Sequence, residues 1–258
     1  MGTILFSDIV FGPIKSRRLG SSLGVNLLPR HGKWCNFDCL YCECGFNKDG
    51  MQDKEIPGKE IVLDALKTKI IELAKVNTVV DSITFSGNGE PTMHPDFPEI
   101  LEVTLLLRNK FMPSAKVSVL TNGSRLGNKA VANALLKADN PIIKIDSANE
   151  ETISLLNRPN FQHSLSETVD LLKNFRHKFV LQTMFLRGEF QGKKIDNTTE
   201  KEINLWHKLV LQIQPREIMI YTIDRETPAK NLEKITVDEM EKIAAPLSAT
   251  GYKITISG

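Results

Sequence analysis

Apolar and polar positions along the chain fall into two alternating kinds of segment. Short apolar runs rich in β-branched residues, without polar alternation, predict strands buried on both faces, as in a parallel sheet. These runs lie at residues 23–29, 82–87, 115–123, 141–146, 178–185 and 217–224, and a last strand is expected at 252–257. Segments with helical periodicity lie at 60–76, 97–111, 128–138, 164–178 and 199–213. The alternation predicts repeated βα units.

The segment 60–76 illustrates the helical pattern. Its apolar stripe is predicted to comprise Ile61, Leu66, Ile70, Leu73 and Ala74. Two further helices are expected where Asn149 and Thr236 precede acidic residues, because these residue types cap helix N-termini and acidic side chains favour the first turn.

Strands joined by helical crossovers run parallel and are connected with a right hand. The predicted fold class is therefore α/β, either a doubly wound sheet or a barrel, and six βα units suit a partial (β/α)6 TIM-like barrel with outer helices. The chain contains no low-complexity linker and no repeat, so a single domain over 1–258 is expected. Residues 194–202 are the most loop-like stretch before a helix.

Composition narrows the functional classes. The 258 residues include 33 basic and 31 acidic side chains, and a net charge of +2 does not by itself indicate a nucleic-acid or membrane partner. No apolar run reaches the roughly 18 residues of a membrane helix. The start of the chain lacks a basic segment and carries Asp8, unlike a signal peptide. A cytoplasmic location without membrane attachment is predicted.

Polar and glycine-rich residues follow the predicted strands at their C-terminal ends, where parallel α/β folds place their sites. These ends read RHGKWCNFDCLYCECG, SGNGEPT, TNG, DSANEE, QTMF and YTIDRETP in chain order. The candidate site is therefore expected to be assembled from several strand ends.

All four cysteines lie between Cys35 and Cys44. In a reducing cytosol, clustered cysteines favour a metal site or catalysis over disulfides. Structural zinc normally uses two pairs of ligands that lie further apart in the sequence. An electron-transfer cluster would use all four cysteines. Three thiolates from Cys35, Cys39 and Cys42 would leave one iron open. The spacing alone leaves these alternatives open.

The spacing C-x3-C-x2-C, with Tyr41 before the third cysteine, resembles the signature of radical S-adenosylmethionine (SAM) enzymes, which have a partial (β/α)6 barrel. GPIKSRRLGSSLGVNLLP, GNGEPTMHPDF, LLNRPN, LQTMF and YTIDRETPAKNLEKIT resemble the branch of wyosine-synthase-related iron–sulfur oxidoreductases. The resemblance implies that Cys35, Cys39 and Cys42 hold a [4Fe–4S] cluster and that Cys44 is a bystander. The open iron would be chelated by the amino and carboxylate groups of SAM.

The same resemblance implies the reaction. A reductant such as flavodoxin or ferredoxin supplies one electron through the cluster, SAM is cleaved, and the resulting 5′-deoxyadenosyl radical abstracts hydrogen from a substrate. The cofactors carry the difficult chemistry, whereas the protein positions them and excludes water.

The resemblance also implies a SAM site. The segment Gly87, Asn88, Gly89 and Glu90 would receive the SAM amino group through backbone groups, and its glycines allow close approach. Tyr41 would pack on the cluster while its backbone meets adenine. Asn122 and Asp146 would bind the ribose, and Gln182 would contact SAM or substrate. The alternatives are tight turns at 87–90 and 121–123, an ordinary buried aromatic at Tyr41 and a hydrogen-bonded buried amide at Gln182.

The substrate is expected to be an RNA base or nucleotide, from the branch resemblance and from arginines such as Arg158 and Arg225, which can bind phosphate or carboxylate. The alternative for these arginines is a solvated face or salt bridges. Wyosine synthase itself has a second set of three cysteines, whereas only Cys44 remains here, so a second thiolate-held cluster is excluded by counting. Two other classes are an activase of a partner protein's glycine and an electron-transfer iron–sulfur protein.

Overall fold

The structure is a computed structural model that describes residues 4–50 and 53–258. Its internal contacts divide these residues into two compact units. The N-terminal unit comprises Ile4–Cys35 and Asn47–Ile142, and the C-terminal unit comprises Asn36–Phe46 and Ile143–Gly258. The boundary falls within the cysteine segment and within strand β5 (Asn140–Lys144), so both segments contribute residues to each unit.

The sheet of the N-terminal unit combines a hairpin with parallel strands. Its strands, in sheet order, are β1 (Val10–Ser16), β2 (Gly20–Val25), β3 (Ser82–Phe85) and β4 (Lys116–Thr121). β1 pairs with β2 antiparallel, whereas β2, β3 and β4 pair parallel. Every residue of β3 is buried, as expected for an inner strand with apolar residues on both faces.

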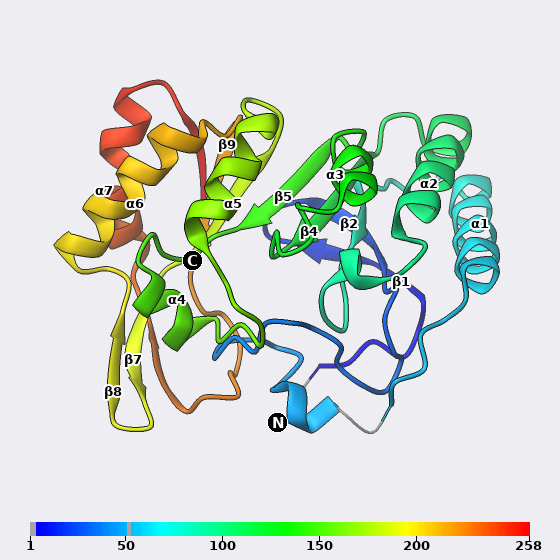
Figure 1. The fold of residues 1–258 in the computed structure, drawn as a ribbon. Coiled ribbons are helices and arrows are strands. Elements are labelled where there is room, and N and C mark those ends of the chain that lie inside the picture. Colours follow the sequence, from blue (N-terminus) through cyan, green and yellow to red (C-terminus); the bar gives the residue numbers. More distant parts are fainter. Residues whose placement is uncertain (1–3, 51–52) are drawn as a thin grey trace. The chain divides into compact units, whose positions relative to one another are not determined.

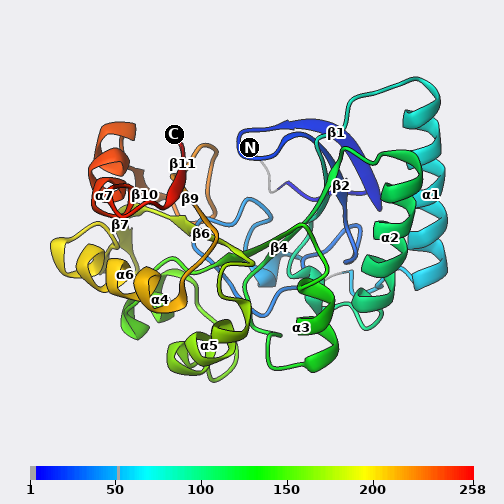
Figure 2. The ribbon, with the colours of Figure 1, turned by 90° about the horizontal axis from the view of Figure 1, so that it is seen from above.

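The helices of this unit are α1 (Lys59–Lys75), α2 (Phe97–Phe111) and α3 (Lys129–Leu135), with 3-10 turns η1 (Asn47–Gly50) and η2 (Pro91–Met93). α1 and α2 lie side by side (Figures 1 and 2). In α1 the buried stripe contains Val62, Leu66 and Ile70, which are four residues apart. The prediction of Ile61 in this stripe is wrong, because the four-residue spacing leads back to Val62 and leaves Ile61 61% exposed.

The C-terminal unit contains two groups of strands. β6 (Val180–Met184), β9 (Glu217–Tyr221) and β11 (Lys253–Ser257) pair parallel in that order. A separate antiparallel sheet has the order β10 (Asn231–Lys234), β7 (Leu186–Phe190) and β8 (Lys193–Asp196). The parallel strands therefore follow the βα pattern, and the antiparallel sheet is an addition to it.

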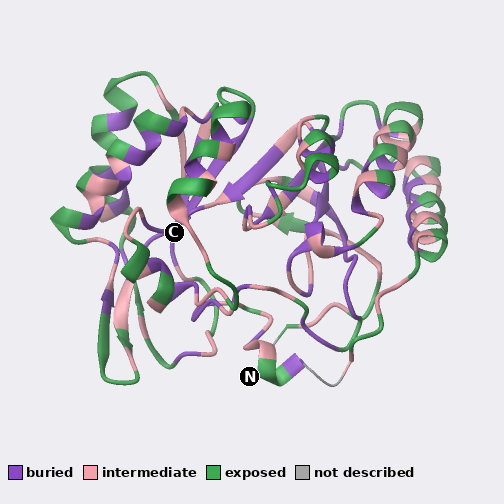
Figure 3. Ribbon diagram, in the orientation of Figure 1, coloured by how far each residue is buried: buried purple, intermediate pink, exposed green. Residues whose placement is uncertain are grey.

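The helical segments of this unit are α4 (Glu150–Leu156), α5 (Leu165–Leu172), η3 (Lys173–Phe175), α6 (Glu200–Ile213) and α7 (Val237–Ala249). Both predicted N-caps are confirmed: the Asn149 side chain accepts from the Glu151 N–H, and Thr236 forms a capping box with Glu239. Figure 3 shows that the helices bury one side and expose the other.

The predicted elements are largely confirmed. Each predicted strand range overlaps an observed strand, including β11, and α2 begins and ends at the predicted residues. The loop predicted at 194–202 is wrong, because it contains the end of β8 and the beginning of α6. Neither β1 nor the antiparallel sheet was among the predicted elements. No helix in the described ranges has the length and hydropathy needed to cross a membrane. A single domain over 1–258 stays a prediction.

Candidate functional site

The cysteine segment is an irregular loop that ends in a turn. Cys39 is buried, Cys35, Cys42 and Cys44 are half-buried, and none of the four forms a disulfide. The Gly45 N–H donates to the Cys42 carbonyl at 2.9 Å, and Gly45 has a φ of 80°. The backbone therefore turns at Glu43 and Cys44. Cys44 could bind the same cluster as Cys42 only if the backbone turned back here. That Cys44 is not a ligand stays a prediction.

Two side chains of the C-terminal unit donate hydrogen bonds to the Cys39 sulfur. Lys144 Nζ lies 3.4 Å from Sγ, and Asn157 Nδ2 lies 3.6 Å from it. Lys144 ends β5, and Asn157 is the C-cap of α4. Neither residue is among the predicted site residues. A cation and an N–H donor both favour the thiolate form of a cysteine, which is the form that binds metal.

Asp146 holds both of these donors. Its Oδ2 accepts from Lys144 Nζ at 2.9 Å, from Asn157 Nδ2 at 2.6 Å and from the Tyr41 hydroxyl, and its Oδ1 accepts from the Met184 N–H at 2.9 Å. The Asp146 side chain is fully buried. Each of its oxygens is thus engaged by protein donors, and its predicted contact with a ribose stays a prediction.

The protonation of the Asp146 neighbours follows from their surroundings. Burial raises the pKa of the Tyr41 hydroxyl well above its usual value, and the nearby Asp146 carboxylate raises it further. Burial alone lowers the pKa of Lys144, but Asp146 outweighs it and the net pKa is raised. At neutral pH Tyr41 is therefore a neutral phenol and Lys144 an ammonium, and both act as donors.

In the N-terminal unit, the glycine-rich turn after β3 lies against the residue before Cys35. The Trp34 N–H donates to the Asn88 carbonyl at 2.9 Å, and the Glu90 N–H donates to the Trp34 carbonyl at 3.1 Å. Gly89 has a φ of 137°, and a Cβ there would lie 1.9 Å from the Trp34 carbonyl oxygen. A glycine is therefore required at residue 89, both by its backbone angle and by this close approach.

Gly87 meets the same two requirements. Its φ is 145°, and a Cβ there would lie 2.6 Å from Asn26 Oδ1. The Asn26 oxygen also accepts from the Asn88 N–H at 3.1 Å. The tight turn expected as an alternative is therefore present at 87–89, and the contact of this turn with SAM stays a prediction.

Asn88 is buried, and its side chain binds the backbone of the segment that precedes β1. Nδ2 donates to the Pro29 carbonyl at 2.7 Å and to the Phe6 carbonyl at 3.0 Å, and Oδ1 accepts from the Phe6 N–H at 2.8 Å. The Asn88 side chain thus connects the segment before β1, at Phe6, with the segment after β2, at Pro29. Its backbone groups are the ones engaged by Trp34 and Asn26.

Glu90 joins the ends of two neighbouring strands. Its Oε1 accepts from the Thr92 hydroxyl at 2.5 Å and from the Thr121 hydroxyl at 2.7 Å, and also from the Thr92 N–H at 3.1 Å. Its Oε2 accepts from the Asn122 N–H at 2.7 Å. Burial raises the pKa of Glu90, although these four hydrogen bonds oppose the shift. Glu90 therefore holds the β3 and β4 ends together, and no ion pair to it is formed by residues 4–50 and 53–258.

Asn122 lies between Glu90 and the first cysteine. Its backbone N–H is bound to Glu90, and its Nδ2 lies 3.8 Å from Cys35 Sγ. Its Oδ1 accepts from the Ser124 N–H at 3.0 Å, as in an Asx turn. The tight turn that was the alternative to ribose binding is therefore present at Asn122. In addition, the Asn122 side chain faces Cys35, a predicted metal ligand.

Gln182 lies on β6 and is 5% exposed. Its backbone carbonyl accepts from the Ile145 N–H at 3.0 Å. Among the described residues, the Gln182 side-chain amide is not one of the buried groups left without a hydrogen-bond partner. The predicted contact of Gln182 with SAM or substrate stays a prediction, as does the alternative of a hydrogen-bonded buried amide.

The two arginines proposed for substrate binding make ion pairs with the cysteine loop. Arg158 lies 3.6 Å from Asp38, and Arg225 lies 2.6 Å from Glu43. The Arg158 guanidinium also lies 5.3 Å from the ring centre of Phe46. The alternative of salt bridges is therefore confirmed for both arginines.

The donor set fits an iron–sulfur cluster chemically. Thiolates are the ligands of such clusters, and N–H groups that point at ligand sulfurs are typical of them. Side-chain N–H groups face Cys39 and Cys35 here. No group of three His, Cys, Asp or Glu side chains in the described chain is arranged around a metal position. The fit therefore rests on ligand type and hydrogen bonding.

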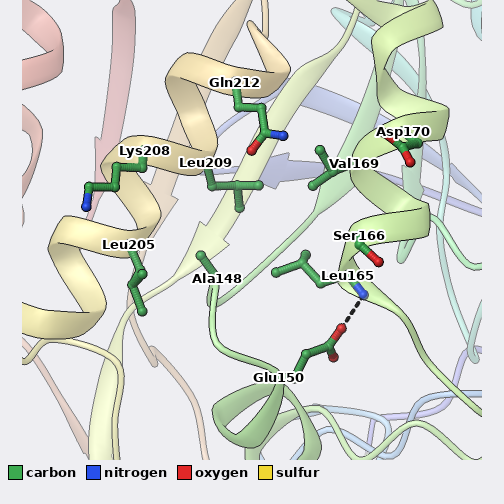
Figure 4. Close-up of a pocket in the computed structure, with 10 residues that line it drawn as sticks. All are labelled: Ala148, Glu150, Leu165, Ser166, Val169, Asp170, Leu205, Lys208, Leu209 and Gln212. Carbon is green, nitrogen blue, oxygen red and sulfur yellow. Dashed lines mark hydrogen bonds between the residues drawn. The ribbon is translucent and has the colours of Figure 1, made fainter.

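A surface groove of about 510 Å³ lies elsewhere in the C-terminal unit, between α5 and α6 (Figure 4). Its lining includes Leu165, Val169, Leu205 and Leu209, with Lys208 among its polar residues. The predicted cluster and SAM residues are not part of this lining. The groove is therefore separate from the candidate site.

Comparisons with known proteins match the whole candidate region. A sequence profile described as "Radical SAM superfamily" matches residues 30–193, which is more than half of the chain and includes all four cysteines. The chain is 30% identical over 237 residues to a protein named "GTPase Obg" from Brachyspira hyodysenteriae, with 90% of this chain and 32% of that protein covered. It thus spans about a third of that relative's length. A Helicobacter pylori protein named "UPF0026 protein" is 28% identical over 238 residues, with 91% and 72% covered.

Among solved structures, a radical SAM methyltransferase from Sphaerobacter thermophilus is similar, with a TM-score of 0.67 at 14% identity. The match covers 92% of this chain and 65% of that one. At this identity the likeness shows the fold alone. It confirms the predicted fold class, the α/β partial (β/α)6 barrel of mostly parallel strands with outer helices.

Proposed function

Because the chain belongs to the radical SAM superfamily, we propose that it is a radical SAM enzyme whose Cys35, Cys39 and Cys42 hold one [4Fe–4S] cluster. The observation that carries the proposal is the profile match across the cysteine segment. The two N–H donors at the Cys39 sulfur support it, because they favour a thiolate. The iron left without a protein ligand is the proposed position of SAM.

When bound, the cluster and SAM supply a 5′-deoxyadenosyl radical that abstracts hydrogen from the substrate. The chain's own groups bind and orient SAM. We assign this role to the backbone of Gly87–Glu90, to Asn122 and to the side-chain amide of Gln182. Glu90 holds the β3 and β4 ends in place for this contact through its bonds to Thr121 and Asn122.

Tyr41 and Asp146 complete the proposed site. The Tyr41 hydroxyl donates to Asp146, so the third-cysteine side of the loop is fixed to the end of β5. We propose that this bond keeps the loop closed around the cofactors, with the Tyr41 backbone near adenine and Asp146 near the ribose. Residues 1–258 would act as one radical SAM domain.

For the substrate, we propose an RNA base or nucleotide, in keeping with the resemblance to wyosine-synthase-related oxidoreductases. The internal ion pairs of Arg158 and Arg225 remove one argument for a phosphate site at those residues, so the substrate rests on the branch resemblance. RNA that binds this protein with a steep salt dependence would support the assignment, because phosphate contacts release counterions. Binding of a partner protein instead would favour an activase.

The chemistry is tested by anaerobic reconstitution of the chain with iron and sulfide, followed by dithionite and SAM. The expected product is 5′-deoxyadenosine, measured by mass spectrometry. Cys39→Ser should lose both the cluster and the product. A chain with about four irons that forms no 5′-deoxyadenosine would disprove the radical SAM proposal.

Cys44→Ser is the matched control. It should keep about four irons per chain and full product formation, because Cys44 is not a proposed ligand. The turn at Cys42–Gly45 specifically favours a second candidate, an electron-transfer cluster with four cysteine ligands. Equal loss of iron in Cys44→Ser and Cys39→Ser, with no SAM cleavage by the native chain, would establish that second function.

A further inference from the structure

The Cys39 sulfur accepts hydrogen bonds from two side chains of the C-terminal unit. It receives one charged donor, Lys144 Nζ at 3.4 Å, and one neutral donor, Asn157 Nδ2 at 3.6 Å. The Cys35 sulfur, in the other unit, receives a neutral donor from Asn122 at the longer distance of 3.8 Å. The Lys144 contact places a positive charge directly beside the Cys39 sulfur.

The position of this charge is determined by surrounding groups. Lys144 Nζ donates to Asp146 Oδ2 at 2.9 Å, lies 2.9 Å from the Tyr41 hydroxyl, and lies 5.4 Å from the ring centre of Phe37. Its side chain is 17% exposed, which limits screening by water. Asp146 also holds Asn157 Nδ2 at 2.6 Å. One buried carboxylate thus orients both donors toward the same sulfur.

We propose that Lys144 and Asn157 are positioning residues that raise the reduction potential of the cluster through Cys39, with Asp146 as their anchor. This inference rests on the proposed function for the presence of the cluster. Lys144 and Asn157 act on the ligand sulfur and need not touch SAM or substrate. The side chain at the end of β5 would therefore make the cluster easier to reduce.

The physical reason is the change of charge on reduction. A cluster that accepts one electron becomes more negative, and part of this charge resides on its ligand sulfurs. A nearby cation and N–H donors stabilise the reduced state more than the oxidised state, and these are the effects that set cluster potentials. The carboxylate of Asp146 opposes Lys144, but the ammonium is the group in contact with the sulfur. The net effect is a higher potential.

The test is a dye-mediated redox titration of the reconstituted cluster, followed by its absorbance and by electron paramagnetic resonance of the reduced form. In Lys144→Met, the ratio of reduced to oxidised cluster at a fixed applied potential should fall about tenfold, which is a shift of about 59 mV to more negative potential for one electron. Asn157→Leu should shift in the same direction by a smaller amount. Lys144→Arg should keep most of the native potential, because the charge is retained.

Lys208→Met is the control for loss of one positive charge, since Lys208 lies in the α5–α6 groove. Its potential should match that of the native chain. Unshifted potentials in Lys144→Met and Asn157→Leu, with full iron content, would overturn the inference. A shift of equal size in Lys208→Met would also overturn it, because the effect would then be one of net charge.

If Lys144→Met does not retain the cluster, Asn157→Leu decides, and an unshifted potential there overturns the inference. Failure of the proposed function can be distinguished from failure of this inference. A native chain that binds a cluster but does not cleave SAM still allows the potentials to be compared. A native chain that binds no iron rejects the proposed function and this inference together.

Discussion

Two buried carboxylates at strand ends, one in each unit, are surrounded in contrasting ways. Glu90, after β3, accepts four hydrogen bonds from hydroxyl and backbone donors, and within the described part of the chain it forms no ion pair. Asp146, after β5, also accepts four hydrogen bonds, but one donor is the ammonium of Lys144. The number of bonds is the same, and the charge of the donors differs.

The contrast shows two ways of building a site. Around Glu90, the backbone determines the geometry, because Gly87 and Gly89 adopt positive φ and pack against Asn26 and Trp34. Around Asp146, side chains determine it, and the Cys39 sulfur receives their N–H groups. The first arrangement suits contact with a ligand through backbone groups. The second suits control of charge near a thiolate.

The largest effect is expected from Asp146→Leu, which tests whether the charged network is one unit. The change leaves the Lys144 ammonium buried without its carboxylate, and removing one partner of a buried pair costs about 3–5 kcal/mol. The free energy of unfolding, measured with urea, should fall by that amount. Adding Lys144→Met should recover part of the loss, because the unpaired charge is then removed.

The control for this cycle is Glu102→Leu, which breaks the exposed Lys137–Glu102 pair. Its effect should stay below about 1 kcal/mol, as for surface pairs in general. If Asp146→Leu costs no more than Glu102→Leu, or if Lys144→Met worsens the double variant, the two carboxylates do not differ in the way described.

The sequence predicted the parts of the fold that depend on local periodicity. Helix α2 and the parallel strands have the apolar patterns that solvent exclusion imposes on helices and inner strands. β1 and β8 were missed, because their residues are mostly half-buried or exposed and lack such a run. Edge and antiparallel strands are stabilised by their neighbours, which a local pattern does not contain.

The candidate site was predictable where the residue type itself is the signal. The glycines at 87 and 89 and the cysteine spacing belong to this kind. Lys144 and Asn157 were missed, because their partner Cys39 lies 105 and 118 residues away in the sequence. A lysine at the end of a strand and an asparagine after a helix have many ordinary uses, so only the folded chain shows that both donate to one sulfur.

The second largest effect is expected from Gly89→Ala, which tests the backbone-built site. A methyl group would overlap the Trp34 carbonyl carbon and oxygen, and a non-glycine residue at φ 137° is strained. Backbone strain and overpacking each cost about 1–3 kcal/mol. The free energy of unfolding should therefore fall by about 3 kcal/mol. Gly58→Ala is the matched control, because its Cβ meets no atom within 4 Å and its φ is −62°.

A native-like stability for Gly89→Ala would show that the turn can move away from Trp34. The close approach would then be incidental, and the Glu90 region would not be fixed by its backbone. A loss as large in Gly58→Ala would indicate that any added methyl group destabilises this unit, which would remove the same distinction.

The smallest effect is expected from Glu90→Gln. A glutamine offers one acceptor and one donor group, so in either orientation one N–H, that of Thr92 or of Asn122, faces an amide NH2. A buried N–H left without an acceptor costs about 1–3 kcal/mol. The urea unfolding free energy of the variant should fall by this amount below about pH 4, where the raised pKa of Glu90 contributes most to native stability.

The pH dependence of this loss decides how the two carboxylates differ. Burial raises the pKa of Glu90 above its usual value of about 4.3, so the folded state binds a proton more tightly than the unfolded state. The contribution of this group to native stability is therefore largest below pH 4 and falls as the pH rises through the raised pKa. Glutamine does not titrate, so the advantage of the native chain over Glu90→Gln should shrink in that range. The stability difference between the native chain and Glu90→Gln could instead grow as the pH rises. The four hydrogen bonds would then stabilise the ionised carboxylate of Glu90 without a cation. In that case the cation beside Asp146 would not be what distinguishes the two sites.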